Sequence, residues 1–224
     1  MLETRHVSLC YGATRALRDV TLRIDPGACV ALMGASGSGK SSLLHCLGGV
    51  ILPDEGSIVV DGIDLTGLSD RERSRLRLER IGMVFQFGDL VPELTLIENV
   101  MLPLQLLGRR TTEARRRATE LLGLLGIAEL ADNRTGAVSG GQAQRAAVAR
   151  AMVHEPKIVL ADEPTGALDS INAEAVLDAL VEMTRSAGTT QLVVTHDNLV
   201  ASHLHTLVTM HDGAILSTPT GASA

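Results

Sequence analysis

The chain has 224 residues, 45% of them hydrophobic and 21% charged, which is enough apolar side chain to bury a core in one large domain. Its formal net charge of −6 argues against an extended nucleic-acid surface, so we expect no nucleic-acid partner. No stretch is long and apolar enough to span a bilayer, and the N-terminus lacks a signal-peptide pattern. We therefore expect a cytoplasmic protein that does not itself cross a membrane.

The N-terminal segment alternates between polar and apolar residues from Glu3 to Ile24. This pattern predicts two half-exposed antiparallel strands. Tyr11 is the only tyrosine of the chain and stands at the end of the first strand. Its ring could stack on a purine or could cover the edge of the core, and the residues alone leave both readings open.

The three cysteines, Cys10, Cys29 and Cys46, lie in apolar segments and lack the spacing of metal ligands. We expect buried, reduced thiols without a chemical role.

Residues 34–41 read GASGSGKS and fit the phosphate-loop pattern G-x-x-x-x-G-K-[ST]. An apolar strand pattern precedes them and an apolar helix pattern follows, which is the context that such a loop requires. Lys40 is expected to reach the β- and γ-phosphates of a nucleotide, and Ser41 to bind Mg²⁺. The residues expected to bind the nucleotide here are Gly34, Ala35, Ser36, Gly37, Ser38, Gly39, Lys40, Ser41 and Ser42.

The middle of the chain changes from strand to helix patterns. Residues 57–60 predict a strand between two turns, and residues 70–80 predict a highly charged helix with Arg75 and Glu79 at i,i+4 spacing. Such a helix is either a solvated face or a docking surface for a partner or for acidic lipid headgroups. Thr95 and Glu98 form a capping-box pattern that opens a helix, and residues 113–125 predict another.

The order of these patterns predicts a single α/β domain. We expect a core with a mostly parallel sheet and an antiparallel β-subdomain over residues 1–89 and 138–217, an inserted helical lobe over residues 90–137, and a disordered tail over residues 218–224.

Four predicted parallel strands end in residues suited to phosphoryl chemistry, and the carboxyl ends of such strands share one edge of a sheet. The first strand ends in the phosphate loop, and the others end at Gln86, at Asp162 with Glu163, and at His196. Asp162 is placed to hold Mg²⁺, while Gln86 can bind Mg²⁺ or orient the attacking water. Glu163 can polarise that water and His196 can donate to the γ-phosphate, so these two and Gln86 are the expected catalytic residues.

A second anion-binding helix start follows at Ser139, Gly140, Gly141 and Gln142. One chain needs only one of the two phosphate sites for a single ATP. A head-to-tail pair of chains would use both, with each nucleotide covered by the partner's Ser139–Gln142 segment.

These motifs together resemble the nucleotide-binding subunit of ABC transporters over essentially the whole chain. The match comprises GASGSGKS, Gln86, VSGGQ at 138–142, IVLADE at 158–163, GALD at 166–169 and His196. The resemblance implies a RecA-like P-loop core, ATP and Mg²⁺ as cofactors, an ATP-bound sandwich homodimer, and adenine stacking by Tyr11. It also implies that Asp169 belongs to the nucleotide site as part of the D-loop.

Within that family, residues 78–104 and 162–170 are similar to the group of MacB, LolD and FtsE. The resemblance implies an ATPase on the inner face of the cell membrane, with the coupling helix of an integral membrane subunit docked near Gln86. The cargo would be a lipoprotein, a peptide or an antibiotic. Two alternatives are an FtsE-like signalling ATPase without cargo and a soluble ABC ATPase of DNA repair or translation; the latter group usually carries insertions for which this chain has no room.

Overall fold

A computed structural model describes residues 1–86 and 89–217 and has the expected α/β architecture. The main sheet has six strands in the order β10-β9-β3-β8-β7-β6, and all neighbours are parallel except β10 with β9. Its strands are β3 (Cys29–Met33), β6 (Ile81–Val84), β7 (Ile158–Asp162), β8 (Thr190–Thr195), β9 (Thr206–His211) and β10 (Ala214–Ser217). The carboxyl ends of five parallel strands thus lie along one edge of the sheet.

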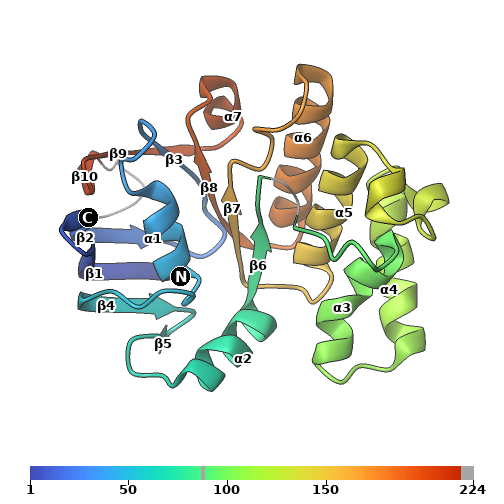
Figure 1. The fold of residues 1–224 in the computed structure, drawn as a ribbon, viewed down its shortest axis with the longest axis horizontal. Helices are drawn as coiled ribbons and strands as arrows, with labels where there is room; N and C mark the ends of the chain where they lie inside the picture. The colour runs from blue at the N-terminus through green and yellow to red at the C-terminus, as the bar shows by residue number, and fades with distance from the viewer. Residues whose placement is uncertain (87–88, 218–224) are drawn as a thin grey trace.

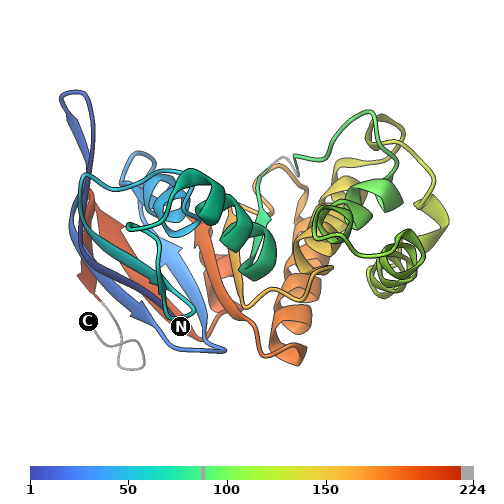
Figure 2. The ribbon, with the colours of Figure 1, turned by 90° about the horizontal axis from the view of Figure 1, so that it is seen from below.

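The predicted antiparallel subdomain is present as a second sheet in the order β2-β1-β4-β5. Its strands are β1 (Leu2–Tyr11), β2 (Thr14–Ile24), β4 (Glu55–Val60) and β5 (Ile63–Asp64). Figures 1 and 2 show this sheet at one end of the molecule and the inserted helical lobe at the other, with the main sheet between them.

Three of the helices begin with a capping box. Thr95 and Glu98 form the predicted capping box at the start of α3, and Ser69 with Glu72 and Ser139 with Gln142 form two more. The helices are α1 (Lys40–Leu47), α2 (Asp70–Arg80), α3 (Leu96–Leu106), α4 (Thr111–Leu124), α5 (Gly140–Met152), α6 (Ser170–Ser186) and α7 (Asn198–Ser202), with short 3₁₀ turns η1 (Ala128–Leu130) and η2 (Thr135–Ala137). The short α7 does not emerge from the sequence pattern.

Successive side chains along a strand of the main sheet point to opposite faces and pack into two separate hydrophobic cores. In β3, Val30 and Leu32 face α1 and the antiparallel sheet, whereas Ala31 faces the side covered by α3 to α6. All three are fully buried. Because both faces are covered, the strands are near-continuous apolar runs, and the polar residues that follow them are left at the open edge.

Most arginines of helix α2 form hydrogen bonds or ion pairs with other residues of the chain. Arg77 donates to the carbonyl of Gly49 (2.7 Å) and Arg80 pairs with Asp61 (2.6 Å). Arg75 forms the predicted pair with Glu79 (2.7 Å). The first two contacts tie α2 to the loop after α1 and to the turn after β4, so the structure favours a supporting role for this helix over a docking surface.

One sequence expectation needs correction. Cys10 is exposed because its side chain lies on the outer face of β1, whereas Cys29 and Cys46 are buried as expected. β9 and β10 form a C-terminal hairpin, and β9 also pairs in parallel with β3, so the hairpin belongs to the main sheet. The tail predicted for residues 218–224 lies outside the described residues.

Gly82 of β6 offers a test of how tightly the sheet packs on α5. A Cβ at this position would overlap the carbonyl oxygen of Ala151 near the end of α5, where backbone cannot move aside cheaply. We expect Gly82→Ala to lower the free energy of unfolding by about 2–3 kcal/mol in urea denaturation. The control is Gly123→Ala in α4, where a Cβ meets open space and should leave stability unchanged or raise it by up to about 1 kcal/mol. Equal stability of the two variants would contradict this packing.

Candidate functional site

A cavity of about 470 Å³ opens at the carboxyl edge of the main sheet. It brings together most of the residues predicted from the strand ends. Its lining consists of Tyr11, Thr14, Arg15, Ala16, Ser36, Gly37, Gly39, Lys40, Ser41, Ser42, Gln86, Glu163, Val194 and His196. Tyr11 reaches the cavity from the end of β1 with its side chain half exposed, as a residue that stacks on a purine must be.

The phosphate loop has the backbone that its glycines allow. Gly37 and Gly39 have φ angles of +80° and +100°, which other residues adopt only with strain. A Cβ at Gly34 would overlap the carbonyl oxygen of Met210 in β9, so this close approach also requires glycine. Strand β9 therefore supports the loop.

Lys40 is buried at the start of α1 and is folded back into the loop. Its Nζ donates to the carbonyl oxygens of Gly34 (2.7 Å) and Ala35 (2.9 Å). The ammonium group thereby lies inside the ring of loop residues that the sequence assigns to the phosphates, and it can exchange these carbonyls for phosphate oxygens.

Asp162 at the end of β7 has the features of a ligand for a hard cation. Its Oδ1 is buried and makes no hydrogen bond within the described residues. Burial raises the pKa of this carboxyl, and a hydrogen bond from Ser41 partly opposes the shift. A buried anionic oxygen without a partner, next to a hydroxyl, fits Mg²⁺, which prefers oxygen ligands.

The raised pKa has a consequence for stability. A carboxyl whose folded-state pKa lies above its unfolded value destabilises the fold at neutral pH, and the penalty disappears as the pH falls below the unfolded pKa of about 3.9. We therefore expect Asp162→Asn to raise the melting temperature of the nucleotide-free chain at pH 7.5 in EDTA, with the difference shrinking toward pH 4. A variant that melts below the wild type at pH 7.5 would contradict the penalty.

Glu163 and His196 form a pair across two neighbouring strand ends. His196 Nδ1 lies 2.7 Å from Glu163 Oε1, and the Thr195 hydroxyl lies 3.5 Å from the other carboxylate oxygen. Glu163 has a φ of +45°, and its N–H donates to the carbonyl of Val194. Glu163 lines the cavity whereas Asp162 is not part of its lining, so the two adjacent acids can have different roles.

Gln86 is half buried and lies against the loop that follows Glu163, since a Cβ at Gly166 would approach its amide nitrogen to 2.9 Å. Helix α5 holds the backbone on both sides of it. Gln144 donates to the carbonyl of Phe85 (2.8 Å) and Arg150 to that of Asp89 (2.8 Å). The sequence analysis did not single out Gln144. A glutamine on the apolar face of a predicted helix could have indicated a buried hydrogen bond at this position.

The segment Ser139 to Gln142 does not line this cavity. It packs instead on the start of α6, where a Cβ at Gly141 would meet Asn172. Asp169 caps that helix by accepting from the backbone N–H of Asn172 (3.0 Å). Thus the structure brings the predicted residues together in two groups, one in the cavity and one outside it.

The parallel sheet, the phosphate loop and the paired acids define a P-loop ATPase of the ATP-binding cassette type. The family model described as ABC transporter matches residues 17–166, and the chain belongs to that family. The resemblance drawn from the sequence motifs is therefore confirmed.

Two curated relatives are lipoprotein-releasing system ATP-binding proteins LolD. The chain is 43% identical to that of Hyphomonas neptunium over 92% of this chain and 90% of the relative, and 39% identical to that of Porphyromonas gingivalis over 97% and 99%. Among solved structures, the chain is similar to the dimeric post-hydrolysis state of the ATP-binding cassette MJ0796 bound to ADP and Pi. That comparison has a TM-score of 0.92, 37% identity and full coverage of both chains.

In the part of the chain that the structure describes, no helix combines the length and the apolar character needed to span a bilayer.

Proposed function

We propose that the chain is the ATP-hydrolysing subunit of a lipoprotein-releasing ABC transporter that works as a head-to-tail dimer beneath a separate membrane subunit. The proposal of a dimer is supported by the separation of the predicted site residues into two groups. The cavity holds the phosphate loop, Glu163 and His196, while Ser139 to Gln142 lie outside it at the exposed start of α5. A second copy can supply the missing segment. The relative that is solved as a dimer with ADP and Pi supports this arrangement.

In this proposal the adenine stacks on Tyr11 and the phosphates lie in the loop of residues 34–42, where Lys40 neutralises their charge. Mg²⁺, held by Ser41, Asp162 and Gln86, would supply charge neutralisation on the phosphate oxygens. Glu163 accepts a proton from the attacking water, and His196 donates to the γ-phosphate. The pairing of His196 with Glu163 keeps the carboxylate pointed at the position of that water.

The partner copy contributes Ser139, Gly140, Gly141 and Gln142 to the same nucleotide, because the backbone N–H groups at the start of α5 form a second anion-binding site. Asp169 belongs to the neighbouring D-loop and is expected at the dimer interface. The Ser139–Gln142 capping box fixes this first turn and occupies the N–H groups of those two residues, so the proposal assigns the phosphate mainly to the N–H groups of Gly140 and Gly141.

A mixing experiment tests the composite site. Lys40→Ala disables the phosphate loop, and Gly140→Asp places a negative charge where the partner's phosphate would bind. A Cβ at Gly140 meets only the side chain of Leu168 at 3.7 Å, so the second variant should fold. We expect each variant alone to hydrolyse no ATP, and an equal mixture to recover about a quarter of wild-type activity, because half of the dimers would hold one intact site.

The control for this experiment is Gly136→Asp, three residues before Ser139, where a Cβ meets open space and wild-type turnover is expected. If the mixture stays inactive while both variants remain folded by circular dichroism, the composite site is wrong. A site within one chain predicts that Lys40→Ala and Gly140→Asp chains never complement each other.

The membrane partner is proposed to dock its coupling helix beside Gln86, between the core and the helical lobe, and to hold the chain on the cytoplasmic face of the cell membrane. The similarity to two LolD subunits over nearly full length supports lipoproteins as the cargo. The test is to purify the tagged chain from membranes in mild detergent and to identify the chain that comes with it. An integral membrane subunit with a large extracytoplasmic domain is expected; copurification with ribosomal or DNA-repair proteins instead would contradict the proposal.

A further inference from the structure

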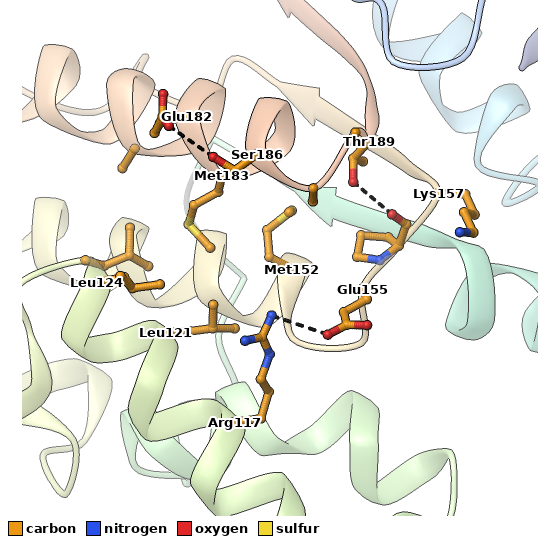
Figure 3. A pocket seen from close by; sticks show the side chains of 15 residues that line it. Arg117, Leu121, Leu124, Met152, Glu155, Lys157, Glu182, Met183, Ser186 and Thr189 are labelled. Atoms are coloured by element: carbon orange, nitrogen blue, oxygen red, sulfur yellow. Dashed lines mark hydrogen bonds and ion pairs between the residues drawn. The ribbon is translucent and has the colours of Figure 1, made fainter.

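A second and larger cavity, of about 690 Å³, lies at the opposite end of the same strands. Lys157 and Thr189, which line it, directly precede β7 and β8, whereas Glu163 and His196 of the nucleotide cavity directly follow these strands. Its remaining walls come from α4 in the helical lobe and from the ends of α5 and α6 in the core (Figure 3). Nothing in the proposed chemistry uses this cavity.

The cavity has apolar side chains along its length and a lysine at one end. Figure 3 shows Leu124 of α4 at the end opposite Lys157, with Leu121, Met152 and Met183 between them and with Glu182 and Ser186 on the Leu124 side. Leu124 is 74% exposed, so the cavity is open to solvent at this end and presents hydrocarbon there. The two methionines can adapt their side chains to the shape of a ligand.

One of the two basic residues that line the cavity already has acidic partners. Arg117 pairs with Glu120 at 3.3 Å and with Glu155 at 3.5 Å, while its buried Nε donates to nothing within the described residues. Lys157 is exposed and forms no ion pair in the described part of the chain. The other acid of the lining, Glu182, is paired with Arg185 (2.6 Å) and accepts from Ser186 (3.0 Å). The uncompensated charge among the described lining residues is therefore the positive charge of Lys157.

We propose that this cavity binds a single-chain amphiphilic anion, namely a medium- or long-chain fatty carboxylate. The acyl chain lies between Leu121, Leu124 and the two methionines, and the carboxylate lies near Lys157. The volume is in the range of about 300–1,000 Å³ that is typical of small-molecule sites, and the combination of apolar walls with a few placed polar groups is their usual chemistry. A ligand in this position would bridge the helical lobe and the core. The inference does not depend on the proposed function.

Binding to the cavity can be measured because the chain contains no tryptophan. Leu124→Trp places a single reporter at the end opposite Lys157, and Leu106→Trp, on the exposed end of α3 outside the cavity, is its control. Titration with laurate below its critical micelle concentration is expected to shift the emission of the first variant to shorter wavelength and to leave the second unchanged. An equal response of both variants, or none, overturns the proposal.

Varying the chain length and the head group of the ligand distinguishes specific binding from nonspecific hydrophobic association. From octanoate to decanoate to laurate, calorimetric Kd on the wild-type chain should fall about tenfold for each added pair of methylenes, as buried hydrocarbon requires. Dodecanol should bind at least tenfold more weakly than laurate. Lys157→Gln should weaken laurate binding at least tenfold and Lys157→Arg should restore it, while both variants retain wild-type nucleotide affinity. Equal binding of the acid and the alcohol, or no effect of Lys157→Gln, contradicts the assignment of the head group.

Discussion

Replacing Glu163 by glutamine is expected to lower ATP turnover by at least about 100-fold while leaving ATP binding intact. The loss follows from chemistry, because glutamine keeps the size of the side chain and cannot accept a proton from the attacking water. The geometry should survive. Two backbone hydrogen bonds hold Glu163 in place. The Glu163 N–H donates to the carbonyl of Val194 (2.9 Å), and the Glu163 carbonyl accepts from the N–H of Gly166 (3.0 Å), so neither bond involves the side chain.

The measurement is steady-state phosphate release together with size-exclusion chromatography in ATP and Mg²⁺, where the variant should accumulate as an ATP-bound dimer. Glu174→Gln, an exposed glutamate on α6, is the matched control and should behave as wild type in both assays. Turnover of Glu163→Gln at the wild-type rate would refute its role as the base. Turnover that is lost without a dimer would instead contradict the composite site.

Much of the site follows from the sequence because its residues occupy the ends of apolar strands. A run of buried residues that stops at a polar one, as in β7 before Asp162 and Glu163 or in β8 before His196, marks the edge of a parallel sheet, and adjacent strands bring such ends together. The capping boxes at Thr95 and Ser139 are equally local. For these features, the residues within one turn or one strand decide the structure.

Other features depend on contacts between distant segments. The pairing of β9 with β3 and the contact of Met210 with Gly34 join positions that are far apart in the chain, so no local pattern shows them. The same holds for Gln144, whose bond to Phe85 holds the backbone beside Gln86. Cys10 is exposed because β1 belongs to a sheet with one solvated face, and a short apolar run does not reveal which face is covered.

Removing the ammonium group by Lys40→Ala is expected to weaken ATP binding by at least about 100-fold. Lys40 is buried, and its Nζ makes two hydrogen bonds to loop carbonyls. A buried ammonium group held only by neutral carbonyls gains much from a polyphosphate, because opposite charges attract strongly where water is largely excluded. The variant loses this gain and leaves the loop carbonyls of Gly34 and Ala35 without a donor.

The affinity is best measured by calorimetric titration with ATP in Mg²⁺, after circular dichroism has shown that the variant is folded. Lys157→Ala is the natural control, because Lys40 and Lys157 are the only lysines of the chain and the second lies at the opposite end of the strands. It should bind ATP as the wild type does. If Lys40→Ala also binds ATP with wild-type affinity, the phosphates do not lie in the loop of residues 34–42. In that case the positions proposed for Mg²⁺ and for the attacking water, which are built outward from this loop, would fail with it.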